Sequence, residues 1–142
     1  VSALDVSVQA QILNLILDLR DRMGLTILFI SHDLNVVQKI CDRVAVVYLG
    51  VVVEEASKEE LFTHTAHPYT KALMDVKPIE HPSLRTNKQI LMGDIPSAVN
   101  VKEGCRFAGR CPRCEKGLCD VVTPPLVEIS PEHKAACHHP LQ

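Results

Sequence analysis

The chain has 142 residues, of which 46% are hydrophobic, and these figures suit one modest globular domain. The formal net charge is −2 at pH 7, so no global basic field indicates nucleic-acid binding. No stretch reaches the roughly 18 apolar residues that a membrane-spanning helix needs, and no signal peptide is recognisable. The chain opens with Val1 inside a loop-like segment, and we therefore expect it to be part of a longer protein.

Residues 6–23 carry the pattern of an amphipathic helix. Apolar residues recur at steps of three and four, at Val8, Ile12, Leu15, Ile16, Leu19 and Met23. Asp5 or Ser7 can cap the first turn, and Gly24 can end the helix in the left-handed conformation. The helix leads into a candidate strand, an order typical of a parallel α/β layer.

Residues 25–30, Leu-Thr-Ile-Leu-Phe-Ile, form a short run that is apolar on both faces. Such a run predicts a strand buried on both sides, within a parallel sheet covered by helices. Ser31, His32 and Asp33 follow, and ligands of parallel sheets bind just beyond the carboxyl ends of the strands. His32 is therefore a candidate site residue. The alternative is a histidine that only caps the next helix or bonds to a loop.

The following segment predicts short elements. We expect a helix over residues 34–41 capped by Asp33, a hairpin of strands over residues 43–49 and 51–55 that turns at Gly50, and helices that open at Ser57 and at Pro68. Ser57 begins a capping-box pattern, Ser-Lys-Glu-Glu. Pro68 suits the first turn of a helix that runs to about residue 75.

Six cysteines are distributed unevenly. Cys41 stands alone, and the other five are Cys105, Cys111, Cys114, Cys119 and Cys137. Clustering in one terminal segment indicates a metal site more than a disulfide framework, and four thiolates suit iron–sulfur or zinc. Free thiols or a disulfide in a small hydrophobic cluster are the alternative. Prolines in this segment favour an irregular module that a metal must hold together, with His133, His138 and His139 in solvent.

Several of these segments resemble the ATPase subunits of ABC transporters. Ser-Ala-Leu-Asp at residues 2–5 resembles the D-loop, and residues 26–34 resemble the switch-histidine segment. Residues 42–55 resemble the sheet segment that follows. His-Pro-Tyr-Thr-Lys-Ala-Leu at residues 67–73 resembles the oligopeptide/dipeptide importer branch.

The resemblance implies an α/β fold in three parts. Residues 1–75 would be the C-terminal part of the nucleotide-binding domain, a P-loop NTPase domain with a parallel sheet. Residues 76–100 would be a linker, with residues 89–92 as a candidate strand. Residues 101–142 would be a small, irregular, cysteine-rich, metal-binding extension.

The resemblance also implies roles for three residues. Asp5, with Ser2, would lie in the D-loop at the interface of two ATPase subunits that pair head to tail around two ATP molecules. His32 would contact the γ-phosphate and help to position the attacking water. This role fits phosphoryl transfer, which is catalysed mainly by positioning and charge stabilisation.

The phosphate loop Gly-x-x-x-x-Gly-Lys-Ser/Thr does not occur in the sequence. The signature motif, the glutamine loop and the Walker B carboxylates of the family are also missing. We expect the full-length protein to be an ATPase that uses ATP and Mg2+. The 142-residue chain should be inactive by itself.

The cysteine segment resembles the C-terminal extension of peptide-importer ATPases, whose pattern runs Gly-Cys-x-Phe-x-x-Arg-Cys-Pro to a final Cys-His. The four matching residues are Cys105, Cys111, Cys119 and Cys137. The step from Cys119 to Pro124 supports Cys119 over Cys114, although the step from Cys111 to Cys119 is one residue longer than in the family. Some peptide importers carry a [4Fe-4S] cluster in this extension, so the resemblance favours iron–sulfur over Zn2+.

The resemblance implies that the full-length protein powers uptake of oligopeptides, dipeptides or related solutes by an ABC importer. It would work with a second ABC ATPase subunit, identical or not, with two transmembrane permease subunits and, indirectly, with an extracellular solute-binding protein. It would lie peripherally on the cytoplasmic face of the cell membrane, without nucleic acid. The rivals are a non-transport ATPase of the superfamily and a non-enzymatic metal-binding module on an α/β scaffold.

Overall fold

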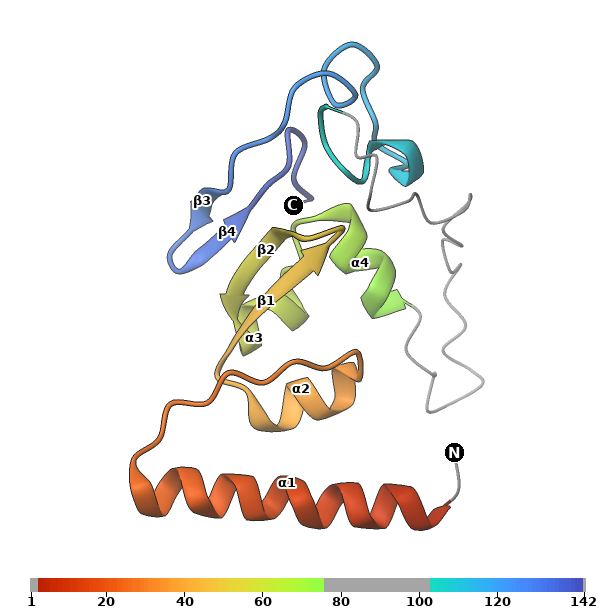
Figure 1. Ribbon diagram of the computed structural model, residues 1–142. Helices are drawn as coiled ribbons and strands as arrows, with labels where there is room; N and C mark the ends of the chain where they lie inside the picture. The colour runs from red at the N-terminus through yellow and green to blue at the C-terminus, as the bar shows by residue number, and fades with distance from the viewer. Residues whose placement is uncertain (1–2, 76–102, 142) are drawn as a thin grey trace. The chain divides into compact units, whose positions relative to one another are not determined.

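The computed structural model describes residues 3–75 and 103–141 of the chain (Figure 1). These residues fall into two compact units, Val1–Cys41 and Asp42–Gln142, and each unit is described by itself. The elements are α1 (Ala3–Met23), α2 (Leu34–Ile40), β1 (Arg43–Tyr48), β2 (Val51–Ser57), α3 (Lys58–Thr63), α4 (Pro68–Asp75), the 3-10 turn η2 (Ala108–Arg110), β3 (Val127–Ser130) and β4 (His133–Ala135). The predicted linker and its candidate strand lie outside the described residues.

The first unit contains the two predicted helices. Helix α1 ends at Met23 and is followed by Gly24 with φ of +62°, the left-handed conformation that the sequence predicted. Helix α2 begins after Asp33, whose Oδ1 accepts from the backbone N–H of Asn35 at 2.9 Å. Helix α1 begins at Ala3, so Asp5 lies inside its first turn instead of capping it.

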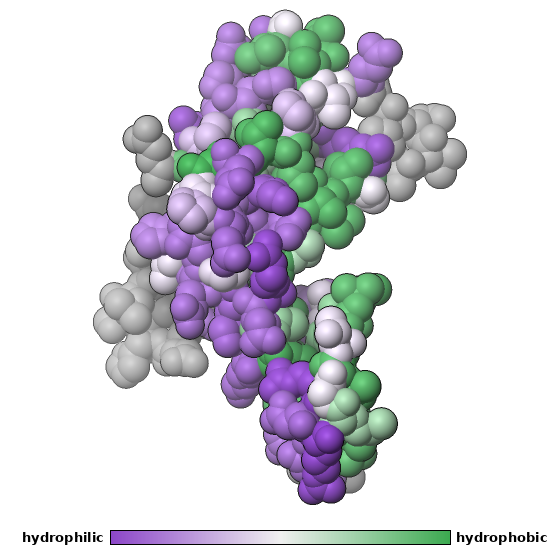
Figure 2. All heavy atoms as spheres, turned by 90° about the vertical axis from the view of Figure 1, so that its left-hand side faces the viewer, coloured by the Kyte–Doolittle hydropathy of each residue, from purple (hydrophilic) through white to green (hydrophobic). Residues whose placement is uncertain are grey.

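The predicted strand over residues 25–30 is wrong for the part of the chain that the structure describes. The segment has no strand assignment, and the side chains of Leu28 and Ile30 are 90% and 89% exposed instead of buried. A strand that is apolar on both faces is buried only when it has strands beside it and helices above and below. None of the described segments forms a ladder with it. Figure 2 shows green apolar spheres on this unit.

The second unit is built on one sheet with the order β1-β2-β4-β3. Strands β1 and β2 form the predicted hairpin, which turns at Gly50 with φ of +80°. Strand β4 adds to the other edge of β2, where Glu54 lies opposite Ala135. Helices and sheet occur together as predicted, but every ladder in the described residues is antiparallel. The parallel pairing was expected from residues 25–30, which form no ladder.

Two helices follow the sheet where the sequence predicted them. Ser57 caps α3, because its Oγ accepts from the N–H of Glu60 at 3.2 Å. Pro68 is the first residue of α4. The loop between the two helices therefore covers residues 64–67, and this short loop positions a buried histidine of the candidate site.

The core of the second unit joins the hairpin to the cysteine-rich segment. The fully or nearly fully buried apolar side chains are Val46, Tyr48, Val53, Ala56, Leu61 and Phe107. The ring of Phe107 lies 5.3 Å from that of Tyr48, edge to face, and 5.4 Å from that of Tyr69. The aromatic residue of the Cys-x-Phe pattern thus anchors the cysteine-rich segment on β1 and α4. The division of the chain at residues 75 and 100 stays a prediction.

Candidate metal centre

One pocket of the second unit is lined by four cysteines, and we call it the cysteine pocket. These are the four that matched the predicted pattern: Cys105, Cys111, Cys119 and Cys137. Cys105 and Cys119 are tied together, because the N–H of Cys105 donates to the carbonyl of Cys119 at 2.7 Å. Cys111 directly follows η2, and Cys137 follows β4 by two residues. No disulfide joins any of the six cysteines.

A close crossing of two loops brings Cys105 to Cys119. Gly104 has φ of +91°, and a Cβ atom on it would lie 2.5 Å from the carbonyl carbon of Asp120. Only glycine fits such an approach in this conformation. The sequence pattern Gly-Cys therefore has a physical reason at this position. The glycine lets the backbone of one cysteine bond to the backbone of another.

Burial is the main influence on the thiols of the cysteine pocket. Burial raises the pKa of Cys111 to about 11 and also raises the pKa values of Cys105 and Cys137. Neighbouring cysteines raise these pKa values further, because thiolates at short range repel each other. A bound metal cation reverses this effect, since coordination deprotonates a thiol outright. The donor set therefore fits a thiolate-bound metal group.

A site for a single metal ion is not formed in the described part of the chain. There, no group of three or more His, Cys, Asp or Glu side chains is arranged to hold an ion. A tetrahedral zinc ion needs sulfurs about 2.3 Å from the metal. The four cysteines surround a pocket instead of converging on such a point, and their metal binding stays a prediction.

The fifth cysteine of the segment, Cys114, does not line the pocket. It lies in the turn after Cys111, where its N–H donates to the Cys111 carbonyl at 3.2 Å. The extra cysteine is therefore explained as a neighbour of the pocket in sequence. His138 and His139 do line the pocket, and the Nε2 atom of His138 lies 2.9 Å from the carbonyl oxygen of Val122.

Sequence reasoning missed one residue of the pocket wall, His67. Its side chain is 1% exposed, and its Nδ1 accepts from the N–H of Tyr69 at 3.0 Å. Its Nε2 is buried without a hydrogen-bond partner among the described residues. Burial lowers the pKa of His67 to about 4, against the opposing influence of Glu54. The His-Pro pair at the start of a predicted helix was the available signal.

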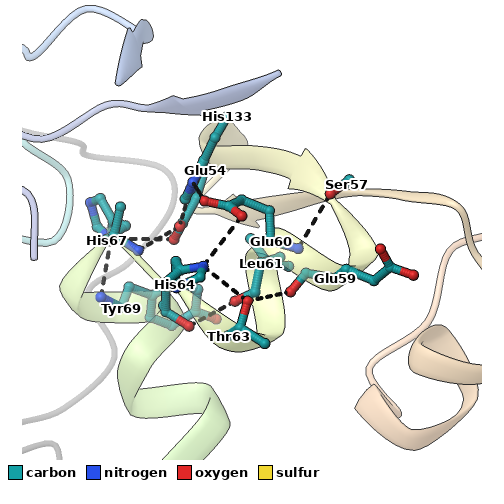
Figure 3. Close-up of polar contacts among 12 residues, drawn as sticks. Glu54, Ser57, Glu59, Glu60, Leu61, Thr63, His64, His67, Tyr69 and His133 are labelled. Atoms are coloured by element: carbon teal, nitrogen blue, oxygen red, sulfur yellow. Dashed lines mark hydrogen bonds and ion pairs between the residues drawn. The ribbon is translucent and has the colours of Figure 1, made fainter. Parts of the chain in front are cut away.

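A buried carboxylate holds the backbone of His67 in place (Figure 3). Glu54 on β2 is 0% exposed and accepts from the N–H groups of Ala66 at 2.6 Å and His67 at 2.9 Å. The Nε2 of His133 on β4 lies 2.8 Å from the same carboxylate. The expectation that His133 is solvated is wrong, because this ring is 1% exposed and pairs with Glu54.

The residues predicted to act on ATP lie in the first unit, apart from the unit that holds the cysteines. His32 is exposed in the bend before α2, next to Ser31, whose Oγ accepts from the N–H of Asp33 at 3.0 Å. Asp5 lies in α1. Ser2 lies outside the described residues. The D-loop and switch roles of these residues stay predictions.

Comparison with known proteins assigns the class of this chain. Residues 53–119, which hold both the β2 strand and three of the pocket cysteines, match the family model of the oligopeptide/dipeptide transporter C-terminal region. The chain thus carries the C-terminal region of the ATP-binding proteins of ABC-type oligopeptide/dipeptide transporters, as the sequence predicted. The α/β class predicted for that region is confirmed with it.

Individual relatives support the same class. The chain is 54% identical over 137 residues to a putative peptide import ATP-binding protein of Brucella ovis, a match that covers 96% of this chain and 43% of the relative. It is 48% identical over 139 residues to the oligopeptide transport ATP-binding protein OppF of Haemophilus influenzae, with 96% and 42% covered. AppF of Bacillus subtilis, also named an oligopeptide transport ATP-binding protein, is 46% identical over 140 residues, with 97% and 42% covered.

The chain spans less than half the length of these relatives. Within the described residues, none of the helices combines the length and the apolar character that crossing a membrane requires.

Proposed function

We propose that the complete protein is the ATP-binding subunit of an ABC importer and that it couples hydrolysis of Mg-ATP to uptake of oligopeptides, dipeptides or related solutes. The observation that carries this proposal is the 54% identity to a peptide import ATP-binding protein across 96% of the chain. Such a subunit works as a homo- or heterodimer with a second ATPase subunit. It binds two transmembrane permease subunits on the cytoplasmic face of the membrane, and a solute-binding protein delivers the solute.

In this proposal, His32 and Asp5 act at the nucleotide. His32 follows an apolar segment and is exposed, so its imidazole is available to a γ-phosphate. A donor at that place stabilises charge that develops in the transition state. Asp5, with Ser2, faces the partner ATPase subunit as part of the D-loop.

The first prediction tests this role in the complete protein. His32→Ala should lower kcat for ATP hydrolysis by about 100-fold, the usual loss for one transition-state donor, while ATP affinity stays nearly constant. Steady-state phosphate release and equilibrium binding of labelled ATP measure the two quantities. The matched control is His64→Ala, because His64 is an exposed histidine of the other unit, with a side chain 72% exposed. Loss of ATP affinity at unchanged kcat would show that His32 has another role.

We also propose that the four cysteines of the pocket bind one metal centre, a [4Fe-4S] cluster, with Zn2+ as the alternative. Three observations support this: four thiols on one pocket wall, no disulfide, and pKa values that only a bound cation would bring below neutrality. A pocket surrounded by thiols also suits a cluster, which is larger than a single ion. The bound group would hold together the loops that carry the four residues.

The second prediction concerns metal content. Cys→Ser at any of the four positions should abolish the bound metal, because thiolate ligands act as a set. Cys41→Ser and Cys114→Ser should retain it, since neither residue lines the pocket. Anaerobic purification, metal analysis and visible absorption at about 400 nm, the usual region for iron–sulfur clusters, measure the result. Stoichiometric zinc would replace the iron–sulfur assignment, and absence of any metal would refute the centre.

A further inference from the structure

The cysteine pocket contains a polar atom that the four thiols do not explain. The Nε2 atom of His67 is buried and has no hydrogen-bond partner among the described residues. Its side chain is 1% exposed and lines the same pocket as the four cysteines. A buried N–H without a partner costs about 1–3 kcal/mol, and native proteins hold few such groups. The atom therefore needs an acceptor that the pocket supplies when it is filled.

The hydrogen bonds of His67 decide which nitrogen carries the proton. The N–H of Tyr69 donates to Nδ1 at 3.0 Å, so Nδ1 acts as the acceptor. A neutral imidazole then carries its proton on Nε2. The low pKa of the ring, about 4, keeps it neutral at physiological pH. A protonated Nε2 has no lone pair for a metal, and His67 is thereby excluded as a ligand through this atom.

The surrounding residues hold the ring in this orientation. Glu54 accepts from the N–H of His67 at 2.9 Å, and Figure 3 shows the His67 ring pointing away from that carboxylate. The ring of Phe107 packs 5.9 Å from the ring of His67. Since Phe107 lies between Cys105 and Cys111 in the sequence, the same loop that carries two cysteines also contacts the histidine.

From this geometry we infer that the Nε2–H of His67 donates a hydrogen bond to the sulfur atoms of the metal centre held by Cys105, Cys111, Cys119 and Cys137. The inference rests on the proposed metal centre and adds to it a residue outside the ligand set. Hydrogen bonds to ligand or cluster sulfurs stabilise negative charge there, and they are among the main influences on the reduction potential of iron–sulfur centres. His67 therefore tunes the centre without binding the metal.

Two substitutions separate the two nitrogens of the ring. In His67→Asn, the side-chain oxygen can replace Nδ1 as the acceptor for Tyr69, but the donor toward the pocket is lost. In His67→Gln, the longer side chain can place an N–H near the position of Nε2. His64→Asn is the matched control, because it makes the same change at an exposed histidine outside the pocket.

The experiment measures metal content and midpoint potential of the complete protein after anaerobic purification. We expect wild type and all three variants to bind the metal, a lower midpoint potential for His67→Asn, and restoration toward wild type in His67→Gln. The reason is that removing a donor makes the added electron less favourable. If the centre is zinc, cobalt(II) substitution replaces the potential, and the sulfur-to-cobalt charge-transfer band should move to longer wavelength in His67→Asn only.

Each remaining outcome contradicts a definite statement. Equal potentials or equal charge-transfer bands in metal-loaded wild type and His67→Asn would overturn the role of His67 while leaving the metal centre intact. A change in His67→Asn that His67→Gln does not reverse at all would assign it to packing instead of the donor. Absence of metal from wild type would overturn the centre itself and this inference with it.

Discussion

Glu54 joins three segments of the chain through a single carboxylate. One oxygen accepts from Ala66 and lies within hydrogen-bond distance of His133, and the other accepts from His67. The partners lie 12, 13 and 79 residues away in sequence. Because the carboxylate is fully buried, each of these bonds replaces solvation that the group has lost.

The third prediction, on stability, follows from this arrangement. Glu54→Gln should lower the free energy of unfolding by about 2–4 kcal/mol, because an amide has one accepting oxygen and its NH2 faces a buried N–H. Urea-induced unfolding of the complete chain measures the change. Glu59→Gln removes a charge from an exposed position of α3 and should cost less than about 1 kcal/mol. Equal losses for the two variants would contradict the assigned role of Glu54.

Residues with local partners could be predicted from the sequence, and residues with distant partners could not. The caps Asp33 and Ser57 bond to N–H groups two or three positions away, so the pattern of a few residues contains all the information. The pairing of Glu54 with His133 depends on two strands meeting across 79 residues. No local pattern contains that contact, and a surface position was the natural expectation for His133.

Elements showed the same division. The β1–β2 hairpin follows from two apolar strands around a glycine turn, which is a local signal. Strands β3 and β4 have only four and three residues, and the sequence analysis expected irregular loops there. They form because β2 offers an edge for β4. For residues 25–30 the error was opposite: a strong strand pattern has no neighbour with which to form a ladder in the described chain.

Two glycines provide a test of the loop that carries Cys105. Gly104 and Gly117 have φ of +91° and +86°, so alanine is strained at both. At Gly104 the added Cβ also lies 2.5 Å from the Asp120 backbone, whereas at Gly117 nothing lies within 4 Å. Gly104→Ala should therefore separate Cys105 from Cys119 and reduce the bound metal, while Gly117→Ala should keep the metal with about 1–2 kcal/mol of strain.

Metal analysis and the urea midpoint of the two glycine variants give the result. A Gly104→Ala protein with full metal content would mean that the close approach of residues 104 and 120 is not needed for the cysteine pocket. The backbone strain is common to both variants, so only the contact differs between them.

At the scale of the whole molecule, the sequence predicted which cysteines lie together but not what they pack against. Clustering and spacing were enough to group four of the five C-terminal cysteines. The shared core of Tyr48, Tyr69 and Phe107 could not be read from the sequence, because it joins segments separated by the predicted linker. The exposed apolar side chains of the first unit are a second whole-molecule feature. A continuous patch of this kind favours association.

The strand order β1-β2-β4-β3 also fixes a sequence of events during synthesis of the protein. Residues 51–57 leave the ribosome long before residues 133–135, so one edge of β2 stays unpaired while nearly 80 further residues are made. Unpaired edges are sites of aggregation, and contacts between distant residues form slowly. The fourth thiol, Cys137, emerges only after β4. Loading of a metal and completion of the sheet are therefore both confined to the last stage of translation or to the time after it.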